Sequence, residues 1–285
     1  EILGIMIYFC ESNEKLHFCK VLLRFCFFDL MNQKMIWLFC VSLSVSCGSN
    51  ESLKSKESQN NELHTISDTL DEVAFIDSLV SANLLELGFV KISSIDSVIQ
   101  IDLKYAFSDN FMKRQLYDTL KTVYLRKSVA VRLHNSQQSL DSLRPGYYLL
   151  VYDGVRPLSV QKEMWNALDS IPAERRGKFV SNPSYGSVHN FGAAIDLTIC
   201  NELGEELDMG AGYDDFREIA FPSLEKQFLE NGQLSKTQYE NRKLLRKVMK
   251  AQRFYNIPSE WWHFNAYSRA YCDSLFQPLL FESGN

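Results

Sequence analysis

Two short stretches, Ser187–Asp196 and Glu260–His263, lie far apart in this chain and together carry two imidazoles and two carboxylates. A fold that brings them to one point has to turn the chain near Gly192 and place Asp196 on a strand. Two imidazoles and one carboxylate can form a three-ligand zinc site with an open fourth position, and a second carboxylate beside it can act as a general base. Two of only five histidines lie in these stretches, which we take as the candidate active site.

Taken alone, the two stretches differ in how specifically they indicate a metal site. His189 and Asp196 stand seven positions apart, which is a weak signal because a core histidine and a capping aspartate are the commoner interpretation. His263 supplies the third donor that a metal site needs. Two tryptophans separate it from Glu260, and apolar surroundings raise the pKa of a carboxylate, which suits it to take a proton from water and pass it to a leaving amine. The alternative is an exposed glutamate and a histidine packed between tryptophans.

Arg156 follows an apolar run, residues 147–152, that predicts a buried strand. At the end of such a strand the guanidinium can point into a cleft. There it would hold a substrate carboxylate or stabilise the oxyanion that builds on a scissile carbonyl. A structural salt bridge with Asp153 is the alternative.

The composition narrows the class of protein. Apolar residues make up 46% and charged residues 23%, which is ordinary for a globular domain. The net charge of -5 argues against a general nucleic-acid binder. The sequence contains no C-x-x-C pair, P-loop, dinucleotide-binding glycine pattern or G-x-S-x-G elbow. Cys200 and Cys272 leave open a disulfide in an oxidising compartment.

The N-terminal part of the sequence predicts export. Residues 1–30 mix Cys, Phe and scattered charges, and we interpret them as a segment upstream of the true start. Residues 31–47 follow the signal-peptide pattern, and Cys47 after a small residue resembles the lipobox of bacterial lipoproteins. Residues 48–66 are polar and predict a tether to the domain at 67–285. We therefore expect a periplasmic or cell-envelope protein that contacts the membrane through a lipid on Cys47, with a buried helix as the alternative for the apolar segment.

Hydrophobic periodicity predicts a single α+β domain with helices and strands interspersed. Helices are expected from residue 67 to about 88, and at 116–140, 159–168 and 236–254. Strands are expected at 89–92, 98–103, 147–152, 191–199 and 261–265. His134, within the second of these helices, is expected at the surface and not as a metal ligand.

Five motifs occur in an order that resembles one family. They are residues 102–111 (DLKYAFSDNF), 152–157 (YDGVRP), 187–198 (SVHNFGAAIDLT), 208–210 (DMG) and 260–264 (EWWHF). In this order they resemble the D-alanyl-D-alanine dipeptidase family of zinc peptidases, over residues 88–270. The resemblance implies an α+β fold in which a small antiparallel sheet, flanked by helices, carries the metal ligands.

The resemblance also implies a role for each residue of the two stretches. The zinc ligands, for one ion per chain, would be His189, Asp196 and His263. Glu260 would be the catalytic base and acid, and Arg156 would stabilise the transition state. The implied reaction is hydrolysis of a small dipeptide substrate, D-alanyl-D-alanine, with no nucleic-acid partner.

The resemblance also implies which residues contact the substrate. Asp214 matches a family acid that holds the free amino group of the substrate, although Asp215 is adjacent to it. Arg156 and Ser187 would also contact substrate. Phe191, where related enzymes tend to carry Arg, and the run at 112–115 depart from the family pattern, so we expect a different pocket rim.

Two other functions remain open on the sequence. A related D,D- or L,D-carboxypeptidase would use the same metal residues to trim longer muropeptides in an open groove. A non-catalytic zinc lipoprotein that binds peptidoglycan fragments belongs to another class. The presence of Glu260 argues against it, because a structural zinc site usually has four protein ligands and needs no base.

Overall fold

The computed structural model describes residues 74–282. The predicted signal peptide, its Cys47 and the predicted tether lie outside these residues and stay predictions. Within residues 74–282, no helix is both long enough and apolar enough to span a membrane.

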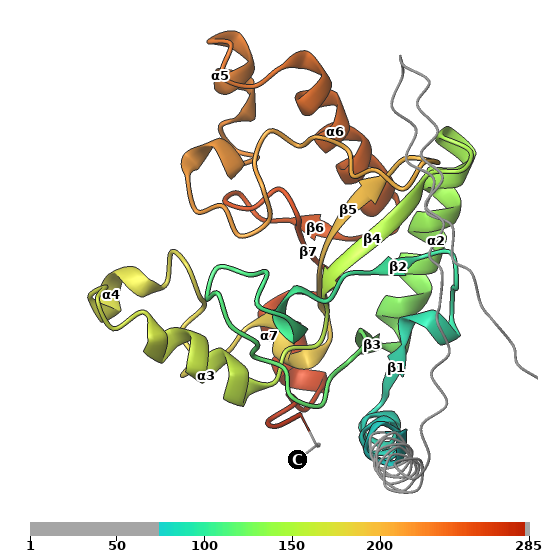
Figure 1. Cartoon of the computed structure of the whole chain (residues 1–285), viewed down its shortest axis with the longest axis vertical. Helices are drawn as coiled ribbons and strands as arrows, with labels where there is room; N and C mark the ends of the chain where they lie inside the picture. Colours follow the sequence, from blue (N-terminus) through green and yellow to red (C-terminus); the bar gives the residue numbers. More distant parts are fainter. Residues whose placement is uncertain (1–73, 283–285) are drawn as a thin grey trace, which may run out of the picture. The chain divides into compact units, whose positions relative to one another are not determined.

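A five-stranded sheet forms the centre of the domain (Figure 1). Its order is β2 (Gln100–Ile101), β4 (Tyr148–Asp153), β5 (Ala194–Cys200), β7 (His263–Asn265) and β6 (Tyr255–Asn256). The β2–β4 pair is parallel and the other pairs are antiparallel. All seven residues of β5 are buried, so this strand lies in the core, which is what its continuous apolar sequence favours.

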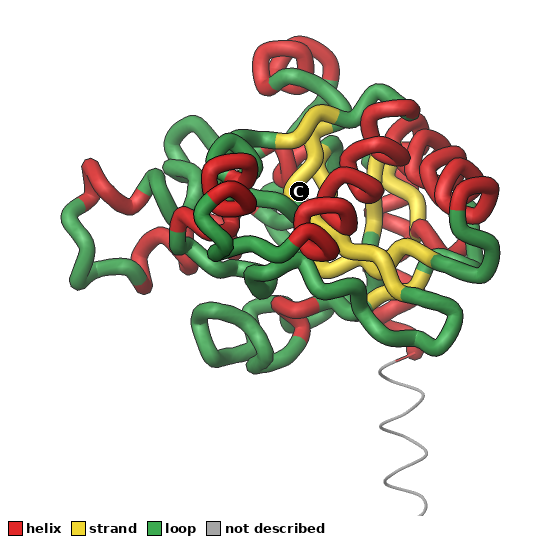
Figure 2. Tube along the Cα trace, turned by 90° about the horizontal axis from the view of Figure 1, so that it is seen from above, coloured by secondary structure: helices red, strands yellow, loops and turns green. Residues whose placement is uncertain are grey.

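Helices surround the strands (Figure 2). Residues 74–86 are helical, and a separate antiparallel pair follows, β1 (Phe89–Lys91) with β3 (Tyr124–Arg126). The α-helices with printed bounds are α2 (Lys127–Leu143), α3 (Leu158–Ala167), α4 (Ala173–Arg176), α5 (Glu225–Glu230), α6 (Lys236–Ala251) and α7 (Arg269–Leu275). The 3-10 turns are η1 (Ile92–Ser94), η2 (Lys104–Ala106), η3 (Val188–Phe191) and η4 (Glu218–Ala220). In Figure 1, α2 runs beside β4. The mixed architecture confirms the predicted α+β class.

Helix α6 anchors the loop that follows β5. Ser235 caps the helix and Gln238 completes a capping box, which satisfies two backbone donors of the first turn. On its buried face, Arg242 donates to the carbonyl oxygens of Met209 (2.6 Å) and Ile219 (3.0 Å). The loop between these two residues is therefore fixed by a buried charged side chain.

Four predicted elements are confirmed with small changes at their ends, and the helix at 116–140 is partly wrong. Helix α2 begins at Lys127, because Tyr124–Arg126 form a buried strand paired with β1. Leu116 and Leu120 are buried although they are not helical. Their spacing, close to a helical period, comes from an irregular segment packed on the core, which periodicity does not separate from a helix. The confirmed elements are β1, β4, α3 and α6.

Smaller differences concern strand ends and side-chain partners. The 98–103 strand shortens to β2, Phe191 belongs to η3 instead of a strand, and the two tryptophans precede β7. Cys200 and Cys272 are both buried and free, so no disulfide joins them. His134 is partly exposed and its Nδ1 lies 2.7 Å from Asp96 Oδ2, so it has a carboxylate partner outside the candidate site.

Candidate active site

Strand register brings the three predicted metal ligands together. β5 and β7 are antiparallel neighbours in which Asp196 pairs directly with His263. His189 comes from η3, just before β5, and the chain turns back at Gly192, whose φ of 62° is the left-handed conformation that glycine tolerates. The predicted turn at Gly192 and the predicted strand position of Asp196 are both present.

The three donor atoms lie at distances that suit one small cation. His263 Nδ1 is 3.0 Å from Asp196 Oδ1, and His189 Nε2 is 3.1 Å from His263 Nδ1 and 3.3 Å from Asp196 Oδ1. Ligands bound tetrahedrally to zinc at its usual bond lengths are about 3.3 Å apart. All three residues are buried. The arrangement therefore matches the donor set and the spacing of a three-ligand metal site.

Both histidines are also held on their outer sides. His189 Nδ1 lies 2.7 Å from the Gly154 carbonyl oxygen, which can only accept, so the proton is on Nδ1 and Nε2 is free to bind a cation. His263 Nε2 lies 3.0 Å from Asn265 Oδ1. Outward hydrogen bonds of this kind are usual for histidines that bind metals.

Mutual proximity shifts the protonation of these groups. Burial alone would raise the pKa of Asp196, but the neighbouring imidazoles of His189 and His263 hold it well below its ordinary value. Burial opposes protonation of His263, yet its hydrogen bond to the Asp196 carboxylate raises its pKa. The carboxylate is therefore ionised and available as a ligand, while protonation of His263 would compete with its binding of a cation.

Arg156 is both salt-bridged and directed into the site, so the two interpretations of this residue are compatible. Its Nε and Nη2 donate to Asp153 Oδ2 at 2.9 and 2.6 Å, and Nη2 also lies 3.6 Å from Asp196 Oδ2. Tyr117 donates to the other oxygen of Asp153 (2.8 Å). The guanidinium is thus fixed at the cavity wall.

Glu260 lies beside the candidate metal site, formed by His189, Asp196 and His263, without belonging to it. Its Oε2 is 3.8 Å from His263 Nδ1, and its side chain is 28% exposed. Burial raises the pKa of Glu260 above its ordinary value, although the charge of His263 opposes this. A carboxylate with these properties can exchange a proton with a water or an amine in the cavity.

Asp214 lies in the same cavity, whereas Asp215 forms a salt bridge with Arg217 at 2.6 Å. Tyr105 donates to both carboxylate oxygens of Asp214, at 3.1 and 3.3 Å. The backbone of Asp214 is left-handed, with a φ of 57°. Burial and then the charge of Asp196 raise its pKa well above the ordinary value. A cationic group placed against Asp214 would offset both effects.

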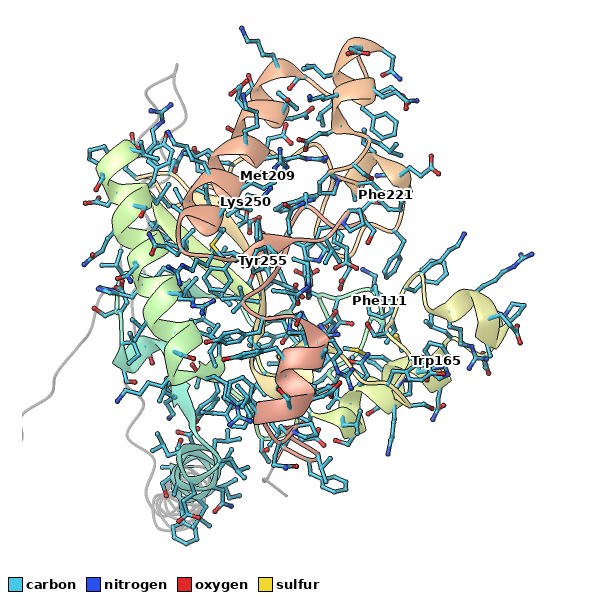
Figure 3. The ribbon with its side chains drawn as sticks, turned by 180° about the vertical axis from the view of Figure 1, so that it is seen from behind. Phe111, Trp165, Met209, Phe221, Lys250 and Tyr255 are labelled. Atoms are coloured by element: carbon cyan, nitrogen blue, oxygen red, sulfur yellow. The ribbon has the colours of Figure 1, made fainter. Side chains whose placement is uncertain are left out.

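These side chains line one cavity of about 270 Å³. Ser187 lies on its wall and caps η3 by accepting from the His189 backbone N–H. Phe111, labelled in Figure 3, lines the cavity as well. Phe191 is buried in the core and does not line this cavity, so the expected difference of the pocket rim from related enzymes stays a prediction. The volume is slightly below the range usual for drug-sized ligands.

Sequence reasoning missed the tyrosine hydroxyl that binds a metal-site carboxylate. Tyr213 donates to Asp196 Oδ2 at 3.1 Å. Its position beside Asp214 in the sequence is the signal that would have drawn attention to it. The bond itself depends on a contact between the 208–215 loop and β5 that no local pattern reveals.

A family model described as D-ala-D-ala dipeptidase matches residues 85–278. The chain belongs to this family of metallopeptidases. The D-alanyl-D-alanine dipeptidase of Escherichia coli K12 is 34% identical over 166 residues, which cover 58% of this chain and 78% of that protein. A D-alanyl-D-alanine dipeptidase of Enterococcus faecalis is 28% identical over 207 residues, which cover 67% of this chain and 98% of the relative. Membership of the D-Ala-D-Ala dipeptidase family confirms the resemblance seen in the five motifs.

Proposed function

We propose that this protein is a zinc-dependent dipeptidase that hydrolyses D-alanyl-D-alanine, or a similar cell-wall dipeptide, into free amino acids. The main supporting observation is the convergence of three donor atoms within 3.3 Å of one another, from His189, Asp196 and His263. Zinc held there would retain an open position and lower the pKa of a bound water to about 7. Membership of the D-Ala-D-Ala dipeptidase family supports the substrate class.

The chain's own residues account for the proton transfers and the charge that develops. Glu260 takes a proton from the attacking water and later delivers it to the departing amine, and its raised pKa suits both steps. Arg156 is held by Asp153 before any substrate arrives, so it needs little reorganisation to stabilise the oxyanion on the scissile carbonyl.

The cavity suits a short peptide with a free amino group. Its volume of about 270 Å³ is small, and Asp214 on its wall offers a carboxylate to an ammonium group. An ammonium there would bring the pKa of Asp214 back down, so the substrate would restore the charge that binds it. Ser187 and Arg156 add further polar groups to the cavity wall.

The test incubates the purified, zinc-loaded protein with D-Ala-D-Ala, L-Ala-L-Ala and a pentapeptide ending in D-Ala-D-Ala, and measures released alanine. The proposal expects cleavage of D-Ala-D-Ala, lost with chelator and in Glu260→Ala. Cleavage of the pentapeptide would instead assign a carboxypeptidase. One tightly bound zinc ion without turnover of any substrate would leave the binding-protein function.

We also propose, on the sequence pattern alone, that a lipid on Cys47 holds the protein at the cell envelope. Labelling of cells with a fatty-acid analogue tests this. Wild-type protein is expected to take up label and to fractionate with membranes, and Cys47→Ala is expected to do neither.

A further inference from the structure

The two oxygens of the Asp196 carboxylate have different surroundings. Oδ1 faces the two imidazole nitrogens, at 3.0 Å from His263 Nδ1 and 3.3 Å from His189 Nε2. Oδ2 points to the other side, where the Tyr213 hydroxyl donates to it at 3.1 Å and Arg156 Nη2 lies 3.6 Å away. One oxygen is therefore directed to the metal position and the other is occupied by a protein donor.

The Tyr213 ring is held in place by other aromatic rings. Its centroid lies 4.8 Å from that of Tyr152, 5.5 Å from Trp262 and 6.2 Å from Tyr105. The loop that carries Tyr213 is fixed as well, because Trp261 Nε1 donates to the Ala211 carbonyl oxygen at 3.0 Å. The hydroxyl therefore reaches Asp196 from a rigid support.

Three tyrosines of this aromatic cluster bind three different carboxylates. Tyr213 donates to Asp196, Tyr105 to Asp214 and Tyr152 to Glu206 (2.6 Å). A phenolic hydroxyl is ordinarily protonated at neutral pH, so each of the three donates to its carboxylate. Removal of a single hydroxyl from each ring gives three variants with the same loss of volume and different consequences.

We infer that Tyr213 is a positioning residue for the metal centre: its hydroxyl holds Oδ2 of Asp196 so that Asp196 presents one oxygen to the cation. Without the hydroxyl, Arg156 Nη2 would remain as a side-chain donor 3.6 Å from Oδ2. The carboxylate would then rotate toward the cation with both oxygens or draw the guanidinium away from the substrate. This inference rests on the proposed zinc site.

The experiment compares Tyr213→Phe with Tyr152→Phe in the full chain. Zinc affinity is measured by competition with a chromophoric chelator, and the visible absorption of the cobalt(II)-loaded protein reports the number of ligands. The unfolding temperature of the metal-free protein reports folding. Partners that orient metal ligands typically contribute about 10–100-fold to metal affinity.

We expect Tyr213→Phe to bind zinc about 10–100-fold more weakly than wild type and to change the cobalt absorption. Tyr152→Phe is expected to match wild type in both, since its hydroxyl binds Glu206, which lies outside the site. Equal zinc affinity and an unchanged cobalt spectrum in Tyr213→Phe would overturn the inference alone. Failure of the wild type to bind one zinc ion would overturn the proposed function and this inference with it.

Discussion

The candidate metal site (His189, Asp196 and His263) and the neighbouring Glu260 are built in opposite ways. Each residue of the site is buried and makes at least one hydrogen bond away from the metal position, to Gly154, Asn265 or Tyr213. Glu260 is partly exposed, and no hydrogen bond to its carboxylate is found within residues 74–282. The three candidate ligands are thus held by hydrogen bonds, whereas the Glu260 carboxylate keeps its capacity to accept one.

This difference fits two chemical tasks. A ligand has to keep one geometry, and outward hydrogen bonds stabilise that geometry before the cation arrives. A base has to accept a proton and release it within one turnover, so strong partners that hold it in one protonation state would slow it. The comparison predicts that variants of the two regions separate metal binding from catalysis.

The largest effect is expected when one ligand is removed. His189→Ala leaves two donors, so zinc binding at micromolar concentrations should be lost and hydrolysis should fall to background. Metal content by atomic absorption and alanine release check this. His134→Ala is the matched control, because that histidine pairs with Asp96 outside the site and should leave both quantities unchanged. Full zinc content in His189→Ala would contradict the assignment of the ligand.

Glu260→Gln is expected to retain zinc and to lose activity. Positioned acid–base groups contribute about 10²–10⁴-fold to the rate, so kcat should fall within this range. In the wild type, kcat/KM should fall as the pH is lowered through the pKa of Glu260, which is raised by burial, because the protonated form cannot accept a proton. Loss of zinc in Glu260→Gln would place Glu260 among the ligands and remove the contrast between the two regions.

Arg156→Ala tests the preorganised charge at the cavity wall. Removal of one oxyanion donor typically costs about 10²–10³-fold in kcat, and we expect that loss with zinc content unchanged. Arg217→Ala, which breaks only the salt bridge with Asp215, is the control and should keep full activity. A change confined to KM would indicate that Arg156 binds substrate and does not act on the transition state.

Acidification should release zinc gradually. As a zinc ligand, His263 would have to be neutral. Burial opposes its protonation, but its hydrogen bond to Asp196 raises its pKa above the ordinary value of an imidazole. Below that pKa, zinc affinity should fall by about tenfold per pH unit for this one proton. Chelator competition between pH 5 and 8 measures the slope. An affinity independent of pH over this interval would contradict the raised pKa.

The sequence predicted the parts of the site that depend on local pattern. The apolar run around Asp196 identifies a buried strand, and the glycine at 192 identifies the turn that carries His189 back toward it. The order of the motifs indicated the family. The pairing of Asp196 with His263 was not predictable from periodicity, since register between β5 and β7 depends on packing across the sheet.

The elements of the fold that were predicted wrongly also depend on contacts between distant parts of the chain. Leu116 and Leu120 are spaced as on a helix but are buried by tertiary contacts. Strand β3 is buried on both faces, so its apolar residues continue the same pattern and were predicted as helix. Tyr213 was missed because its hydrogen bond joins two distant segments. Burial and long-range pairing, which local patterns do not encode, decided these positions.

The smallest effect is expected at the turn that supports the candidate metal site. A Cβ at Gly192 would lie 2.6 Å from the Phe89 ring and would sit on a left-handed backbone. Strain of either kind costs about 1–3 kcal/mol, so Gly192→Ala should lower the unfolding temperature, by about 2–4 °C for each kcal/mol in a domain of this size. Calorimetry of the metal-free protein measures the shift. Gly177→Ala, which meets nothing within 4 Å, is the control.

Gly192→Ala also tests how the candidate metal site is held in place, which is where it differs from Glu260. The turn at Gly192 positions His189, so Gly192→Ala should weaken zinc binding as well as folding. A ligand that binds only the folded state stabilises it, so saturating zinc should restore part of the lost stability. If Gly192→Ala lowers the unfolding temperature while zinc affinity stays at the wild-type value, His189 is held by its bond to the Gly154 carbonyl oxygen and not by the turn. The candidate metal site would then be kept rigid by the hydrogen bonds of each ligand residue. The backbone between the ligand residues would contribute little to that rigidity.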